Sequence, residues 1–168
     1  VGGGEGEQDG RQDLVGAYTG RIGDLREGAG ENAWLVTHIP FWAIGESDGE
    51  LFTINDILQR ASGNSLKEGI NLVMSGHAHS VELLIFEGDR SPQFVFGFSG
   101  TKLDPPVTVP LTGLEIAGAV IAQGVTFDDF GFVTMEQVDN GWDVTVRNVD
   151  GEEVFKCVII GDFAECFN

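Results

Sequence analysis

Basic residues are scarce in this sequence. Nine Lys and Arg stand against 27 Asp and Glu among 168 residues, which gives a formal net charge of −18 at pH 7. A protein that holds nucleic acid by its phosphate backbone needs clustered Lys and Arg, and adhesion to anionic membranes needs a similar basic patch. The composition therefore excludes nucleic-acid backbone binding and disfavours membrane adhesion. The excess of acid indicates a solvated, self-repelling surface.

Long apolar runs are also missing. No stretch reaches the roughly 18 apolar residues that mark a transmembrane helix, and the first residues lack the basic and apolar regions of a signal peptide. The sequence thus predicts no membrane span. Its opening, "VGGGEGEQDG", is Gly-rich, acidic and without Met. We expect residues 1–10 to be a flexible linker or the edge of a fragment, followed by one domain over 11–168.

Cysteine is rare as well, with two residues that lie close together near the end of the chain. Cys157 and Cys166 stand in "FKCVIIGDFAEC". A disulfide between them would imply an oxidising compartment, whereas two reduced cysteines would behave as small buried apolar groups. The spacing alone leaves both alternatives open.

Apolar residues, by contrast, make up 42% of the chain and include 12 Phe, which is typical of a folded globular domain. Leu14, Tyr18, Ile22 and Leu25 recur at helical spacing and predict an amphipathic helix over 11–27. "AWLVT" at 33–37 and "NLVMS" at 71–75 are short, continuously apolar runs that predict strands buried on both faces. Between them, apolar positions from Leu51 to Ala61 predict a second helix that ends near residue 63. This order favours an α/β fold with short parallel strands.

The remainder of the chain changes character. Five strand-like runs follow: "VELLIF", "QFVFGFS", "FGFVTMEQV", "WDVTVRNV" and "EVFKCVII". Asn140-Gly141 and Asp150-Gly151 favour tight hairpins between the last of them, so we expect an antiparallel meander. The proline-containing stretch 101–124 interrupts these runs and is expected to be a surface excursion near the site.

Histidine is scarce too, with three residues in the chain. His38, His77 and His79 each follow a predicted buried strand, and the carboxyl ends of strands in open α/β sheets form ligand crevices. Neutral imidazole is a preferred ligand of Zn, Fe and Ni. The pattern predicts a shared metal site. The alternative is that the histidines are hydrogen-bonded surface groups.

Two motifs carry a resemblance to a known family. "WLVTHIPFW", followed by "NLVMSGHAHSVELLIF", resembles the last two metal-binding motifs of the calcineurin-like metallophosphoesterases, which include the purple acid phosphatases. In that family, one strand ends in His-x-Pro and a later strand ends in Gly-His-x-His. The likeness covers residues 33–86 well, and "FVFGFSGTKLD" and the later hairpins are similar to the C-terminal strands of bacterial members.

The resemblance implies the C-terminal half of a four-layer α/β/β/α sandwich, with a mixed sheet and antiparallel C-terminal strands. It implies metal-dependent hydrolysis of phosphate esters, either small molecules or phosphoproteins, at a centre of two metal ions (Fe, Zn or Mn). His38 and His77 would bind one metal, and His79 the other. Phe41 and Trp42 would line the substrate cleft or, as aromatics more commonly do, pack in the core.

The sequence also departs from the family. The family's Asp-x-His, Gly-Asp-x-x-Asp and Asn-His motifs are absent, since "GDLRE" and "GDFAE" have Glu in place of the second Asp and Asn64 precedes Ser65. We therefore expect the C-terminal half of a secreted or periplasmic phosphoesterase, with its other half upstream or in another chain and one sheet face left as an association surface. The alternative is a non-catalytic, β-rich binding module whose histidines are structural or hold a single ion.

Overall fold

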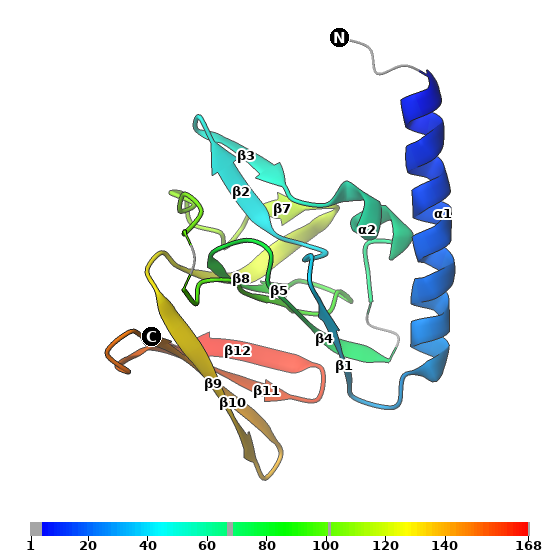
Figure 1. The fold of residues 1–168 in the computed structure, drawn as a ribbon. Helices are drawn as coiled ribbons and strands as arrows, with labels where there is room; N and C mark the ends of the chain where they lie inside the picture. Colours follow the sequence, from blue (N-terminus) through cyan, green and yellow to red (C-terminus); the bar gives the residue numbers. More distant parts are fainter. Residues whose placement is uncertain (1–4, 67–68, 101, 168) are drawn as a thin grey trace.

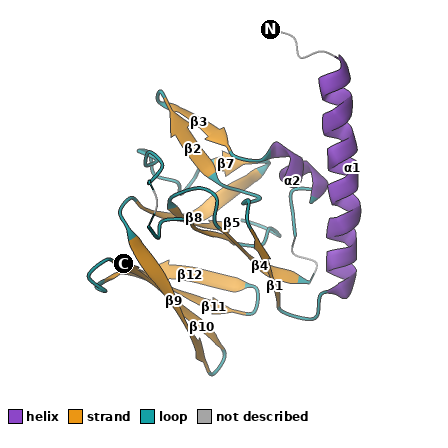
Figure 2. Ribbon diagram, in the orientation of Figure 1, coloured by secondary structure: helices purple, strands orange, loops and turns teal. Residues whose placement is uncertain are grey.

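The computed structural model describes residues 5–66, 69–100 and 102–167, and the described chain is a mixed α/β structure built mostly of strands (Figures 1 and 2). The elements, in chain order, are α1 (Glu5–Gly28), β1 (Ala33–Thr37), β2 (Ile44–Ser47), β3 (Glu50–Thr53), α2 (Asp56–Ala61), β4 (Ile70–Ser75), β5 (Val81–Phe86), β6 (Gln93–Phe96), β7 (Glu115–Ile116), β8 (Ala119–Phe127), β9 (Gly131–Val138), β10 (Gly141–Asn148), β11 (Glu153–Ile160) and β12 (Phe163–Phe167).

The central sheet is mixed, with strand order β1-β4-β6-β5-β8-β7. β1 and β4 pair in parallel, as do β4 and β6, whereas β5 runs antiparallel to β6 and β8. The two strands predicted from "AWLVT" and "NLVMS" are therefore confirmed as parallel neighbours. Of the meander expected after His79, β5 and β6 do pair antiparallel, but β6 also pairs in parallel with β4, and the later runs form a separate sheet.

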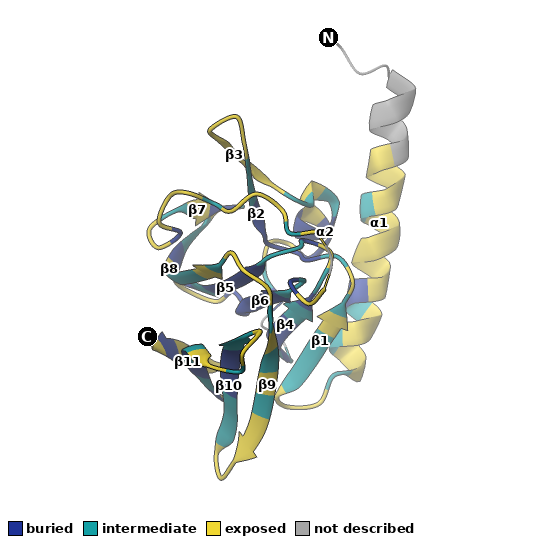
Figure 3. Ribbon diagram, turned by 60° about the vertical axis from the view of Figure 1, so that its left-hand side comes forward, coloured by how far each residue is buried: buried dark blue, intermediate teal, exposed yellow. Residues whose placement is uncertain are grey.

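Alternate residues of the central sheet face two separate cores. Val73 and Leu84 belong to a core with Ile22 of α1 and Leu58 of α2, while Leu72 and Leu83 pack toward the second sheet. Because both faces of β4 and β5 are covered, their sequences read as continuous apolar runs. The described chain thus stacks helices, a mixed sheet and an antiparallel sheet, and Figure 3 shows the buried strands between the exposed outer elements.

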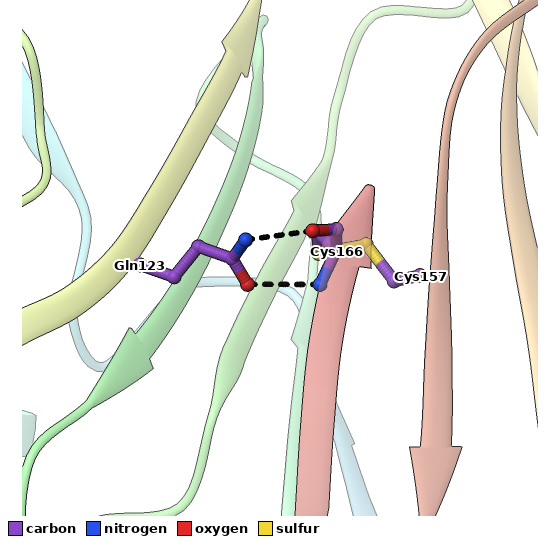
Figure 4. Close-up of a disulfide and its surroundings, with 3 residues drawn as sticks. All are labelled: Gln123, Cys157 and Cys166. Carbon is purple, nitrogen blue, oxygen red and sulfur yellow. Dashed lines mark hydrogen bonds between the residues drawn. A yellow bond between two sulfur atoms is a disulfide. The ribbon is translucent and has the colours of Figure 1, made fainter. Parts of the chain in front are cut away.

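The second sheet is the antiparallel meander β12-β11-β10-β9. Cys157 of β11 and Cys166 of β12 are directly paired and joined by a disulfide, which decides between the two states left open by the sequence. The Gln123 side chain of β8 donates to the Cys166 carbonyl and accepts from its N–H, at 2.7 and 2.8 Å (Figure 4). That amide acts like one more strand residue and joins the edges of the two sheets.

Helix α1 departs from the prediction in its length and in its buried face. It includes residues 5–10, predicted as linker, while residues 1–4 of that linker lie outside the described residues. Of the predicted apolar face, Ile22 is 3% exposed, but Leu14, Tyr18 and Leu25 are 48%, 37% and 50% exposed. Ile22 and Val15 form the face of α1 that packs against the core, and this face lies next to the predicted one because α1 packs against α2.

The segment read as one helix over 51–61 is divided. Asp48 and Gly49 both have positive φ, which suits a tight two-residue hairpin turn, and β2 pairs with β3 across it. The helix begins only after Asn55, whose side chain accepts from the Leu58 N–H as an N-cap. Asp48-Gly49 as a turn and Asn55 as an N-cap are both signals in the sequence, but the helical spacing of the apolar residues favoured a single helix.

Three further strands were not predicted. The stretch 101–124, expected to be an excursion, contains β7 and the first part of β8. The last segment of the chain forms β12, whose alternating burial of Ala164 and Cys166 follows the two-residue period of a half-buried strand. None of the helices in residues 5–66, 69–100 and 102–167 is long and apolar enough to cross a membrane.

The disulfide should stabilise the second sheet measurably. Closing a loop with a sequence separation of 9 residues restricts the unfolded chain, so replacing both Cys157 and Cys166 by Ala is expected to lower the free energy of unfolding by about 2–3 kcal/mol. Urea unfolding with and without dithiothreitol measures this. Reductant should lower the stability of the wild type and leave that of the double variant unchanged; a wild type insensitive to reductant would contradict the prediction.

Candidate functional site

His38 and His77 meet at one edge of the central sheet. β1 and β4 are parallel and in register to their ends, where Thr37 pairs with Ser75, so the residues that follow emerge side by side. His38 Nε2 lies 3.2 Å from His77 Nδ1, and the two rings are nearly perpendicular, at 83°. Both side chains are exposed. The two histidines that the sequence placed at strand ends are thus in contact and open to solvent.

The backbone at His77 is unusual. Its φ is +67°, a left-handed conformation that residues with a side chain adopt rarely and at a cost of about 1–3 kcal/mol. Gly97 allows β6 to end against this turn, because a Cβ at residue 97 would overlap the Ala78 carbonyl oxygen. The Gly97 N–H also donates to the Ser80 carbonyl, at 3.0 Å. The turn that carries His77 and His79 is therefore held in shape by the strand beneath it.

A second loop fixes His79. The His79 N–H donates to Asp104 Oδ2 at 2.8 Å, and the Asp104 N–H donates to the His79 carbonyl at 3.1 Å. This reciprocal pair holds the proline-containing stretch next to the histidine turn, where the sequence predicted it. Asp104 therefore positions the backbone of His79.

One buried amide joins the two histidine-bearing segments. Gln93 is 0% exposed, and its Oε1 accepts from the Phe41 and Trp42 N–H groups at 3.0 and 3.4 Å. Its Nε2 donates to Ser75 Oγ at 2.9 Å. Ser75 stands two residues before His77, and Phe41 three residues after His38. Gln93 thus fixes the distance between the loop after β1 and the end of β4.

A buried carboxyl group makes a second connection of this kind. Glu82 on β5 is 2% exposed, and it accepts from the Ile44 N–H at 2.9 Å and from the Ser80 hydroxyl at 3.5 Å. Burial is the main cause that raises the pKa of Glu82 to about 7; the hydrogen bonds from Ile44 and Ser80 oppose it, and the nearby charge of Asp104 adds to it. Glu82 therefore changes its charge near neutral pH, directly behind the histidine turn.

The structure brings together some of the predicted residues and separates others. Among residues 5–66, 69–100 and 102–167, no group of three or more His, Cys, Asp or Glu is placed to hold one metal ion. His79 thus stands apart from the His38–His77 pair. Phe41 and Trp42 are 3% and 0% exposed and pack in the core, which is the alternative that the sequence favoured over a cleft lining.

Sequence reasoning missed the supporting residues. Glu82 is a charged residue inside the apolar run "VELLIF", and Gln93 opens the equally apolar "QFVFGFS". A polar residue within a predicted buried strand needs a hydrogen-bond partner. The presence of Glu82 and Gln93 in such strands was therefore a signal that they bind other segments. The reason for Gly97 is not visible in the sequence, because it depends on the approach of the Ala78 carbonyl from another strand end.

Comparison of the sequence with models of known protein families finds no match, and a search of curated proteins finds none either.

Gln93 is expected to position the histidines as well as to stabilise the core. Gln93→Leu leaves buried N–H groups without an acceptor, which should lower the free energy of unfolding by about 2–4 kcal/mol. It should also shift the imidazole ¹⁵N resonances of His38 and His77. Gln123→Leu is the matched control, since it removes two backbone hydrogen bonds far from the histidines. If both variants leave the imidazole resonances unchanged, Gln93 has no positioning role.

Glu82 should make stability depend on pH. Because its pKa is raised from 4.5 to about 7 in the folded state, the folded protein binds more protons than the unfolded chain between these values. Stability should therefore fall as the pH rises from 4.5 through 7, by up to about 3 kcal/mol. Glu82→Gln should remove this part of the slope in urea unfolding, whereas Glu87→Gln at an exposed position should not. Equal slopes in all three proteins would contradict the assignment.

Proposed function

We propose that this chain supplies histidine ligands to a binuclear metal centre that hydrolyses phosphate esters, as the C-terminal half of a calcineurin-like metallophosphoesterase. The observation that supports the proposal best is the approach of His38 Nε2 to His77 Nδ1, 3.2 Å, at the ends of two parallel strands. These are the two histidines to which the family resemblance gives one shared metal ion.

The distance suits two ligands of the same ion. Metal–nitrogen bonds of about 2.1 Å that meet at about 100° place the two nitrogens about 3.2 Å apart. Both imidazoles are exposed, so an ion could reach them without the core opening. The donor set also fits Zn, Fe or Mn, which take neutral imidazole readily. The alternative for the same geometry is a hydrogen bond between one protonated and one unprotonated ring nitrogen.

His79 would bind the second metal ion, and the remaining ligands would come from the missing half. Among the described strands, β1 has a hydrogen-bonded neighbour only on the β4 side, and Val36 on this edge is 71% exposed. An upstream segment or another chain that adds strands there would bring carboxylates to the same sheet edge. Two bound ions would supply Lewis-acid polarisation of the phosphoryl group and a hydroxide nucleophile at neutral pH.

The substrate would be a small phosphate ester or a phosphoprotein, and the protein would work outside the cytosol. The Cys157–Cys166 disulfide supports a secreted or periplasmic location, since disulfides persist mainly in oxidising compartments. The described half alone is not expected to turn over phosphate esters strongly, because it lacks the family's bridging carboxylate.

Metal binding tests the proposal directly. Isothermal calorimetry with Zn²⁺ or Mn²⁺ should show stoichiometric binding to the wild type and a loss of at least about tenfold in affinity in His38→Ala and His77→Ala. Cobalt(II) substitution should give visible bands typical of nitrogen ligation. Glu136→Gln, on the exposed face of β9, controls for ions held by the acidic surface and should bind as the wild type does.

Two outcomes would count against the proposal. If the wild type binds no metal, or if His77→Ala binds it as tightly, the histidine pair is a hydrogen-bonded structural contact. The chain would then be better described as a non-catalytic, β-rich binding module.

A further inference from the structure

A hollow of about 370 Å³ lies on the inner side of the histidine turn. His77, Ala78 and His79 line it together with β2, β3, the start of β5, the stretch around Pro105 and the end of β8. Its volume falls within the range of small-molecule sites, which is about 300–1,000 Å³. The hollow is adjacent to the proposed metal ligands, yet the metal-binding role of those histidines does not require it.

The walls are apolar and aromatic. They include Phe52 on β3, Ile54 after it, Phe127 at the end of β8, and Leu103, Pro106 and Val107 from the loop. Phe52 is 50% exposed although it is a large apolar residue, and its ring lies over Gly45, where a Cβ would overlap it. The absence of a side chain at Gly45 thus permits the ring to form a wall. Such rings bind flat aromatic groups well.

Each wall is held in place by specific contacts. Both carboxylate oxygens of Glu46 accept from Thr108, through its N–H at 2.7 Å and its hydroxyl at 2.9 Å, which joins the hairpin to the loop. Asp104 holds the same loop to His79. Phe127 is fixed by an edge-on contact with Phe98, with ring centroids 6.1 Å apart. The hollow is therefore largely pre-formed.

The charges around the hollow restrict its ligand. Glu46, Glu82, Asp104 and Asp128 line it, and among the described residues no Lys or Arg does. The first three already accept hydrogen bonds from Thr108, Ile44 and His79, so their acceptor oxygens are engaged within the protein. An anionic group would be repelled by this lining, and the phosphate of a substrate has no partner there.

We infer that this hollow binds the uncharged aromatic alcohol portion of the phosphate ester, the leaving group, while the phosphate stays on the histidine side. The identification of the ligand as part of an ester rests on the proposed function. The binding of an uncharged aromatic alcohol to the hollow does not, and it is tested in the absence of metal.

The test is titration of the metal-free chain with 2-naphthol, followed by fluorescence and by ¹⁵N-edited NMR. Binding should shift resonances of Phe52, Val107 and Phe127, and Phe52→Ala should weaken it at least about tenfold, as expected for the loss of one aromatic wall. Leu51→Ala is the matched control. Leu51 is a neighbour on β3 with similar exposure, 41%, and does not line the hollow.

The charged analogue provides the second comparison. 2-Naphthoate has the same ring system with a carboxylate and should bind at least about tenfold more weakly than 2-naphthol. The inference is overturned if 2-naphthol perturbs only residues outside the hollow, if Phe52→Ala binds it unchanged, or if both compounds bind equally. If 2-naphthol does not bind in the hollow but the histidines still bind metal, only the leaving-group site is removed. If metal binding is absent and 2-naphthol still binds, the phosphoesterase proposal and the identification of the alcohol as part of an ester are removed, and the aromatic-alcohol site remains.

Discussion

The parallel pairing of β1 with β4 is the constraint on which the candidate site depends. The two strands stay in register to Thr37 and Ser75, so the loops that carry His38 and His77 leave the sheet at the same edge and the same level. A shift in register would separate the imidazoles by a residue or more and turn alternate side chains to the wrong face. Gln93 preserves this arrangement from below, because its amide contacts both segments at once.

The sequence predicts best the strands that contact a core on both faces of the sheet. β4 is covered on both faces, and in β1 Leu35 and Trp34 pack against opposite cores, so the apolar runs identified both strands without reference to any neighbour. The position of the histidines at strand ends followed from the same runs. Their 3.2 Å contact did not follow, because it depends on which strands pair and in what register.

The misread parts are those decided by tertiary contacts. Leu14, Tyr18 and Leu25 have helical spacing and do lie on a helix, yet α2 covers a neighbouring stripe and leaves them exposed. Leu51 also fits a helical pattern, but the turn at Asp48-Gly49 places it in a hairpin. In both cases the apolar residues do recur at helical spacing. The element that packs against them decides which face is buried, and the sequence does not identify that element.

The acidity of the chain bears on any phosphate chemistry at this site. A protein with a formal charge of −18 repels anionic substrates at long range. The buried cation Arg90 cannot offset this, because its guanidinium lies over the rings of Trp42 and Phe86 and donates to the carbonyls of Asn64 and Ala117. Any phosphate chemistry at this site would therefore depend on positive charge brought by bound ions, as in the proposed metal centre.

The backbone conformation of His77 also bears on the orientation of its side chain. The φ of His77 is +67°, which glycine would adopt without strain. Gly76 stands immediately before His77, yet the strained position is occupied by histidine. The strain is maintained by Gly97 beneath the turn and by Asp104 beside it. Strain held in place by several elements is typical of a residue whose side chain must point in one direction, and here that direction is toward His38.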